Sequence, residues 1–108
     1  MDHCEVDLRV FKVKTQAFRF YVYTVPMPTV LRFGGLRVVV YPNDHRPSHV
    51  HVIGNGCEAV FELNCPFGPV TLRENYGFSK VNLRRIRTAL HNRVVALCGA
   101  WEGIHGIA

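Results

Sequence analysis

Residues 48–63 decide the fold, because they have the pattern of two strands joined by a tight turn: Ser48-His49-Val50-His51-Val52-Ile53-Gly54-Asn55-Gly56-Cys57-Glu58-Ala59-Val60-Phe61-Glu62-Leu63. The segments before and after the turn are rich in β-branched and apolar residues, which favour strands. Gly54-Asn55-Gly56 suits a turn that needs positive φ. Strands joined this closely must pair antiparallel, since a parallel crossover needs about a dozen residues or more. We therefore expect an antiparallel hairpin at the centre of the fold.

Further strands are predicted on both sides of this hairpin. Residues 36–41 follow a Gly34-Gly35 turn, and residues 70–74 form a short last strand. Residues 5–14 and 17–25 also alternate like strands, but Pro26-Met27-Pro28 interrupts them. We expect residues 1–26 to be an N-terminal β-hairpin extension and residues 27–108 to be a single domain. The predicted sheet then has four to six strands, depending on that extension.

One long helix is predicted over residues 79–102. Ser79 is a suitable N-cap, and apolar residues recur at steps of three and four: Leu83, Ile86, Leu90, Val94, Leu97 and Trp101. This stripe should cover one face of the sheet, because a small sheet needs a helix on its apolar face. The fold class is therefore α+β, a small antiparallel sheet packed against one long C-terminal helix.

Charge and composition describe an ordinary globular chain with a basic surface. The 108 residues are 48% hydrophobic and 19% charged, with a net charge of +5. The predicted helix has no acid between Ser79 and Trp101, and its polar side carries Lys80, Arg84, Arg85, Arg87 and Arg93. A solvated basic face and a surface for an acidic protein or RNA both explain this pattern.

The cysteines and the hydropathy indicate a cytoplasmic protein. Cys4, Cys57, Cys65 and Cys98 show no Cys-x-x-Cys spacing, and residues 1–26 lack the continuous apolar core of a secretory signal. We expect four reduced cysteines rather than a disulfide framework. No apolar run is long enough to cross a bilayer, so no membrane association is expected.

The candidate chemistry lies at the start of the first hairpin strand. Asp44, His45, His49 and His51 fall within eight residues, and His49 and His51 share one face of an extended strand. As a zinc or other divalent metal site, the ligands would be His49 and His51, completed by His45 or Asp44. As an acid–base pair for RNA cleavage, the histidines need no metal, and Arg46 or Arg37 would stabilise charge on a phosphate. Hydrogen-bonded histidines that only stabilise the turn are the third interpretation.

These residues also carry a family resemblance over residues 27–106. The motifs are Asn43-Asp44-His45 with Pro47, His49-Val50-His51-Val52, Tyr76-Gly77-Phe78-Ser79, and the ending Trp101, His105 and Gly106. The chain resembles the domain-of-unknown-function 4160 family, although Ser48 stands where the family commonly has a second proline. His105 follows Trp101 by one helical turn, so either it supports the histidine cluster or it caps the helix.

The resemblance implies a small bacterial α+β domain, often encoded beside a short partner in arrangements like toxin–antitoxin pairs. It implies no established reaction. The leading functional hypothesis is therefore an RNase-like or RNA-binding component of a two-gene module, which uses the histidine cluster and the basic helix. The alternative is a non-enzymatic protein-binding domain in which the histidines are structural or bind a metal.

Overall fold

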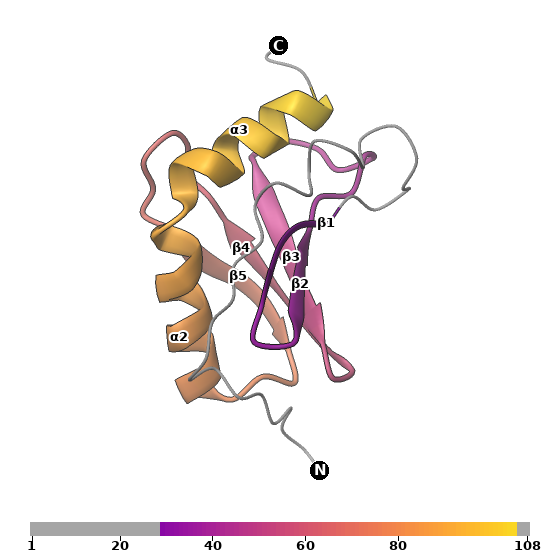
Figure 1. Cartoon of the computed structure of the whole chain (residues 1–108), viewed down its shortest axis with the longest axis vertical. Coiled ribbons are helices and arrows are strands. Elements are labelled where there is room, and N and C mark those ends of the chain that lie inside the picture. Colours follow the sequence, from indigo (N-terminus) through magenta and orange to yellow (C-terminus); the bar gives the residue numbers. More distant parts are fainter. Residues whose placement is uncertain (1–28, 106–108) are drawn as a thin grey trace.

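The computed structural model describes residues 29–105, which form a five-stranded antiparallel sheet and two helices (Figure 1). The strands lie side by side in chain order: β1 (Thr29–Phe33), β2 (Leu36–Val39), β3 (His49–Gly54), β4 (Cys57–Glu62) and β5 (Thr71–Tyr76). Helices α2 (Lys80–His91) and α3 (Val94–His105) follow. The α+β class and the antiparallel sheet are confirmed. The predicted hairpin of residues 1–26 lies outside the described residues.

The central hairpin forms as its turn residues predict. Asn55 and Gly56 both have positive φ, 53° and 78°, the combination that a type I′ turn requires. Gly54 therefore pairs with Cys57, and this pair determines the register of the whole hairpin, with His51 opposite Val60 and His49 opposite Glu62. The turn chemistry thus decides which side chains of β4 lie beside the histidines.

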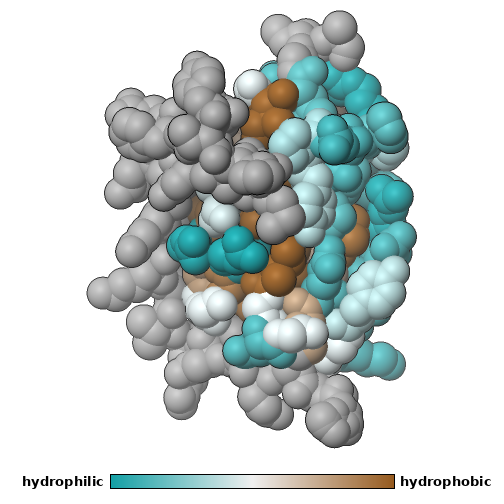
Figure 2. Space-filling view, turned by 90° about the vertical axis from the view of Figure 1, so that its right-hand side faces the viewer, coloured by the Kyte–Doolittle hydropathy of each residue, from teal (hydrophilic) through white to brown (hydrophobic). Residues whose placement is uncertain are grey.

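The core occupies one face of the sheet. Val50, Val52 and Phe61 are fully buried, in one cluster with Ile86 and Leu90 of α2. Because side chains alternate along a strand, His49 and His51 lie on the opposite face, which is called the histidine face below. Figure 2 views the molecule from the right-hand side of Figure 1, away from α2; apolar residues are visible in the middle and hydrophilic ones cover the right-hand part.

The prediction of one long helix is wrong, because the chain turns between His91 and Val94. Asn92 ends α2, and the Arg93 N–H donates to the Leu90 carbonyl at 2.9 Å, three residues back. A straight helix over residues 79–102 would be about 36 Å long at about 1.5 Å per residue. A six-residue strand spans only about 20 Å. The turn allows α3 to cross the end of the sheet where β3 begins, so that Trp101 stays buried.

The start of the helical region does match the prediction. The Asn82 N–H donates to Ser79 Oγ at 3.1 Å, so Ser79 is the N-cap of α2. Ile86, Leu90, Leu97 and Trp101 of the predicted stripe are all buried. Neither α2 nor α3 has the length and apolar character to cross a membrane.

The prediction of reduced cysteines is also wrong. Cys65, in the β4–β5 loop, forms a disulfide with Cys98 of α3, and no cysteine of residues 29–105 is free. The Ser48 hydroxyl lies 3.1 Å from Cys65 Sγ, so the disulfide also contacts the residue that precedes His49. Disulfides persist in oxidising compartments, so the cysteines no longer argue for a cytoplasmic location.

We expect the Cys65–Cys98 bond to stabilise the fold by constraining the unfolded chain. It closes a loop with a sequence separation of 33 residues, and replacing both cysteines with alanine should lower the free energy of unfolding by about 2–4 kcal/mol. Urea unfolding of the wild type and the double variant measures this difference. In a reducing buffer the difference should largely vanish. Equal stability in a non-reducing buffer would show that the bond does not contribute.

Candidate functional site

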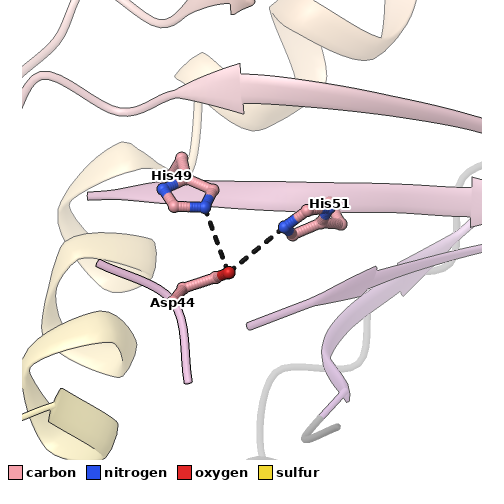
Figure 3. A group of neighbouring side chains, drawn as sticks. All are labelled: Asp44, His49 and His51. Atoms are coloured by element: carbon pink, nitrogen blue, oxygen red, sulfur yellow. Dashed lines mark hydrogen bonds and ion pairs between the residues drawn. The ribbon is translucent and has the colours of Figure 1, made fainter. Parts of the chain in front are cut away.

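Three side chains meet at the start of β3 on the histidine face (Figure 3). His49 and His51 extend from β3, and Asp44 reaches them from the β2–β3 loop. The Asp44 N–H donates to the Tyr41 carbonyl at 3.0 Å, which closes a turn and directs the carboxylate toward the strand. Of the four residues expected to converge, the structure brings these three together and leaves His45 outside the group.

The two ring Nε2 atoms approach the same carboxylate oxygen. Asp44 Oδ2 lies 3.0 Å from His49 Nε2 and 3.2 Å from His51 Nε2. The potential ligand atoms of the three residues all lie within 4.8 Å of one another. The site is largely shielded from solvent, since the side chains of His49, His51 and Asp44 are 6%, 14% and 20% exposed.

The other ring nitrogens are held by separate acceptors. His49 Nδ1 lies 2.8 Å from the Pro47 carbonyl, and His51 Nδ1 lies 2.8 Å from Glu58 Oε2. A carbonyl and a carboxylate can only accept, so each Nδ1 is the donor. In a neutral ring the Nε2 atom then carries a lone pair, and both lone pairs face the Asp44 carboxylate.

This arrangement favours a cation between the three groups. A lone pair beside a carboxylate is repulsive, and two of them face Asp44 here. One divalent cation would remove the repulsion, and its two positive charges would balance the two carboxylates, Asp44 and Glu58.

Aromatic rings cover the cluster on two sides. The Tyr41 ring meets the His51 ring edge-on with centroids 4.2 Å apart, and Trp101 lies 5.2 Å from His49. Burial raises the pKa of Tyr41, as do the negative charges of Glu58 and Asp44, against an opposing effect of Arg37. Tyr41 is therefore a neutral phenol beside the cluster at physiological pH.

His105 contacts the cluster through Trp101. Its ring stacks on the indole at a centroid distance of 3.8 Å, and its nitrogens face the carbonyls of Trp101 and Tyr41 at 3.3 and 3.1 Å. It thus joins the end of α3 to the β2–β3 loop. The supporting role of Trp101 and His105 stays a prediction, since His105 also faces a carbonyl of its own helix, that of Trp101.

The remaining predicted site residues lie elsewhere. His45 and Arg46 are exposed on the β2–β3 loop, outside the group of three donors. Arg37 lies on β2 opposite Ile53, on the histidine face. The three arginines of α2 (Arg84, Arg85 and Arg87) are exposed, on a helix that packs against the opposite face of the sheet. The histidines and the basic helix therefore do not form one continuous site.

An open cleft of about 460 Å³ adjoins the cluster. Asp44 and His49 belong to its wall, with the loop residues 43–47, Glu62 of β4 and Arg73 of β5. Small-molecule sites commonly have volumes of about 300–1,000 Å³. The cleft therefore gives a ligand of that size access to two members of the cluster.

Sequence reasoning missed three residues of this region: Glu58, Glu62 and Arg73. The positions of the first two could have been predicted from the hairpin turn. Its register places Glu58 opposite Ile53 and Glu62 opposite His49, both on the histidine face. Arg73 had no such signal, since its position depends on an irregularity in the β4–β5 pairing.

One family model matches the chain, over residues 35–102, which is more than half of its length. That model is described as "Domain of unknown function (DUF4160)". Comparison with curated protein sequences and with solved structures found no match.

We expect Asp44 and His51 to be energetically coupled in metal-free protein. Asp44→Ala and His51→Ala should each lower the free energy of unfolding by about 1–3 kcal/mol, because each removal leaves partly buried polar groups without a partner. The double variant should depart from additivity by about 0.5 kcal/mol or more. Denaturant unfolding in the presence of a chelator measures the cycle.

The matched control pairs Asp44→Ala with Arg84→Ala, since Arg84 lies on the helix that covers the other face. These two effects should add to within about 0.5 kcal/mol. Additive effects for Asp44 and His51 as well would contradict the shared contact.

Proposed function

The chain belongs to the DUF4160 family, and from the geometry of its histidine face we propose that it binds a divalent transition-metal ion such as zinc through Asp44, His49 and His51. One observation carries this proposal: both Nδ1 atoms donate to fixed acceptors, so both Nε2 atoms face the same carboxylate oxygen. Metal-binding histidines are commonly oriented in this way, by a carbonyl or carboxylate on the second ring nitrogen.

The donor set and its spacing suit zinc. Two imidazole nitrogens and a carboxylate oxygen are standard zinc ligands, and in a tetrahedral site with bonds of about 2.0 Å the donors lie about 3.3 Å apart. Two of the three separations are 3.0 and 3.2 Å, and all the potential ligand atoms lie within 4.8 Å of one another. The same donors also suit iron(II), which commonly binds two histidines and one carboxylate. Metal analysis of the purified protein distinguishes the two ions.

Three protein ligands would leave a coordination position for water or substrate, as in catalytic zinc sites. Asp44 and His49 also belong to the wall of the open cleft, which supports a site that small molecules can reach. A metal that lowers the pKa of a bound water promotes hydrolysis. We therefore place a hydrolytic reaction ahead of a purely structural metal.

Metal-free RNase-like chemistry is the competing proposal. His49 and His51, with ring centroids 5.3 Å apart, would then act as general acid and base. That mechanism needs a ring nitrogen that faces the substrate, whereas both Nε2 atoms face Asp44 and both Nδ1 atoms face other acceptors. The arrangement favours the metal proposal for this reason.

Zinc should bind with a stoichiometry near one, and His49→Ala or His51→Ala should each abolish that binding. The double variant should be little worse than either single variant, because residues of one site are not additive. Glu58→Gln keeps the ligands but weakens the acceptor on His51 Nδ1, and should lower zinc affinity by about 10–100-fold. Calorimetry together with the metal content of dialysed protein measures all four variants.

The matched control is His91→Ala, since His91 is exposed at the end of α2 and distant in sequence from the cluster. Its zinc affinity should equal that of the wild type. His45→Ala should also keep the zinc affinity of the wild type if only Asp44, His49 and His51 bind the metal. A loss of zinc affinity in this variant would show that His45 is a fourth ligand. Wild-type protein that retains no stoichiometric zinc or iron would overturn the metal proposal.

An acidic protein or RNA is the partner that we propose for α2, as in a toxin–antitoxin-like module. The exposed side of this helix carries Lys80, Arg84, Arg85 and Arg87, and its first turn contains no acidic residue. Positive side chains there oppose the helix dipole, so a bound anion would be stabilising. This surface and the histidine face lie on opposite sides of the sheet, so the two proposals can be tested separately.

Replacing Arg84, Arg85 and Arg87 with glutamine should weaken RNA binding and reduce its dependence on salt. The slope of log K against log salt is negative, and each lost phosphate contact should reduce its magnitude by about 0.7–0.9. Fluorescence anisotropy over a salt series measures the slope. Arg32→Gln, on the exposed side of β1, is the control and should leave the slope unchanged. An unchanged slope in the triple variant would exclude α2 from the interface.

A further inference from the structure

The cleft beside the proposed metal site contains groups that the metal itself does not need. Arg46 and Arg73 belong to its wall, together with Glu62 and the ligands Asp44 and His49. Arginine guanidinium groups match the oxygens of phosphate in geometry and charge. The cleft could therefore hold one ligand that contacts the metal and the arginines at the same time.

A β-bulge brings Arg73 into this wall. In the β4–β5 pairing Val60 is opposite Glu74 and Phe61 is opposite Leu72, so Arg73 is an extra residue with no partner position on β4. Strict alternation from Glu74, opposite Val60 on the histidine face, would place Arg73 on the other face. The bulge instead allows Arg73 to line the cleft with Glu62. Bulges that redirect a side chain are common beside functional sites.

Arg73 is held loosely enough to contact a ligand. Its Nε lies 3.9 Å from Glu74 Oε2, and both side chains are more than 40% exposed. An ion pair of this length and exposure contributes little. Binding of an anion in the cleft therefore does not require the loss of a strong interaction at Arg73.

The charge of the cleft depends on the metal. In its wall the two arginines balance the two carboxylates, Asp44 and Glu62, when the histidines are neutral. A bound divalent cation adds two positive charges, of which Glu58, 2.8 Å from His51 Nδ1, offsets one. The metal-free cleft should therefore attract an anion weakly, and the loaded cleft should attract it more strongly.

We propose that the metal-loaded cleft binds the phosphate group of a phosphate monoester, with one oxygen on the metal and others on the guanidinium group of Arg73 and on Arg46. This inference rests on the proposed metal site and adds its substrate class. A monoester is favoured over a diester because its second negative charge strengthens its attraction to the metal and to the two guanidinium groups. The cleft volume of about 460 Å³ suits a small ester.

The test measures anion binding to protein loaded with one equivalent of zinc and freed of excess metal. Inorganic phosphate and methyl phosphate should bind, and dimethyl phosphate and acetate should bind at least ten-fold more weakly. Metal-free wild type should also bind phosphate at least ten-fold more weakly. Arg73→Gln should lose about ten-fold or more in phosphate affinity with unchanged zinc affinity, because it removes one charged hydrogen-bond donor group.

Two further variants make the result specific. Arg32→Gln removes a charge from the exposed side of β1 and should leave phosphate binding unchanged. Glu62→Gln removes a negative charge from the cleft and should strengthen phosphate binding in both the metal-free and the loaded protein. Circular dichroism and thermal unfolding of each variant show that the fold is intact.

Metal analysis of the same samples separates the two proposals. Zinc retained without phosphate binding, or equal phosphate affinity in Arg73→Gln, overturns this inference and leaves the metal site standing. If dimethyl phosphate binds more tightly than methyl phosphate, the proposed preference for monoesters is wrong, and the cleft is assigned to the phosphodiesters of nucleic acids. No zinc retained overturns the metal site and the inference together.

Discussion

Strict alternation of side chains along β3 is the constraint on which the rest of the structure depends. Val50 and Val52 are fully buried against the core that α2 covers. A shift of one residue in the register would place both imidazoles in that core and both valines on the other face. The burial energy of the two valines, about 1.5–3 kcal/mol for each side chain, therefore also maintains the positions of His49 and His51.

The cluster on the opposite face shows how neighbouring acceptors determine what a histidine can do. The Pro47 carbonyl and the Glu58 carboxylate each accept from an Nδ1 atom, which leaves both Nε2 atoms directed at Asp44. These contacts hold the potential donor atoms of the three residues within 4.8 Å of one another. The same contacts leave no ring nitrogen directed at a substrate. They therefore favour metal binding over metal-free acid–base catalysis, although the residue types alone allow both.

The ends of the strands are closed by contacts distant in sequence. The turn between α2 and α3 allows Trp101 to pack beside His49, and His105 joins that helix to Tyr41. The disulfide between Cys65 and Cys98 attaches the β4–β5 loop to the same helix. The cluster therefore lies where the sheet, the β2–β3 and β4–β5 loops and α3 meet. Its side chains have low solvent exposure because these elements surround it.

The sequence by itself determined the features that depend on neighbouring residues: the hairpin at Asn55-Gly56, the shared face of His49 and His51, and the N-cap at Ser79. It also contained the register that places Glu58 and Glu62 on the histidine face. Only the tertiary structure decided where α2 ends, which cysteines pair, that Arg73 joins the cleft wall and that the basic helix lies away from the histidines. These features depend on the length of the sheet and on packing between distant segments, for which local alternation and turn preferences contain no information.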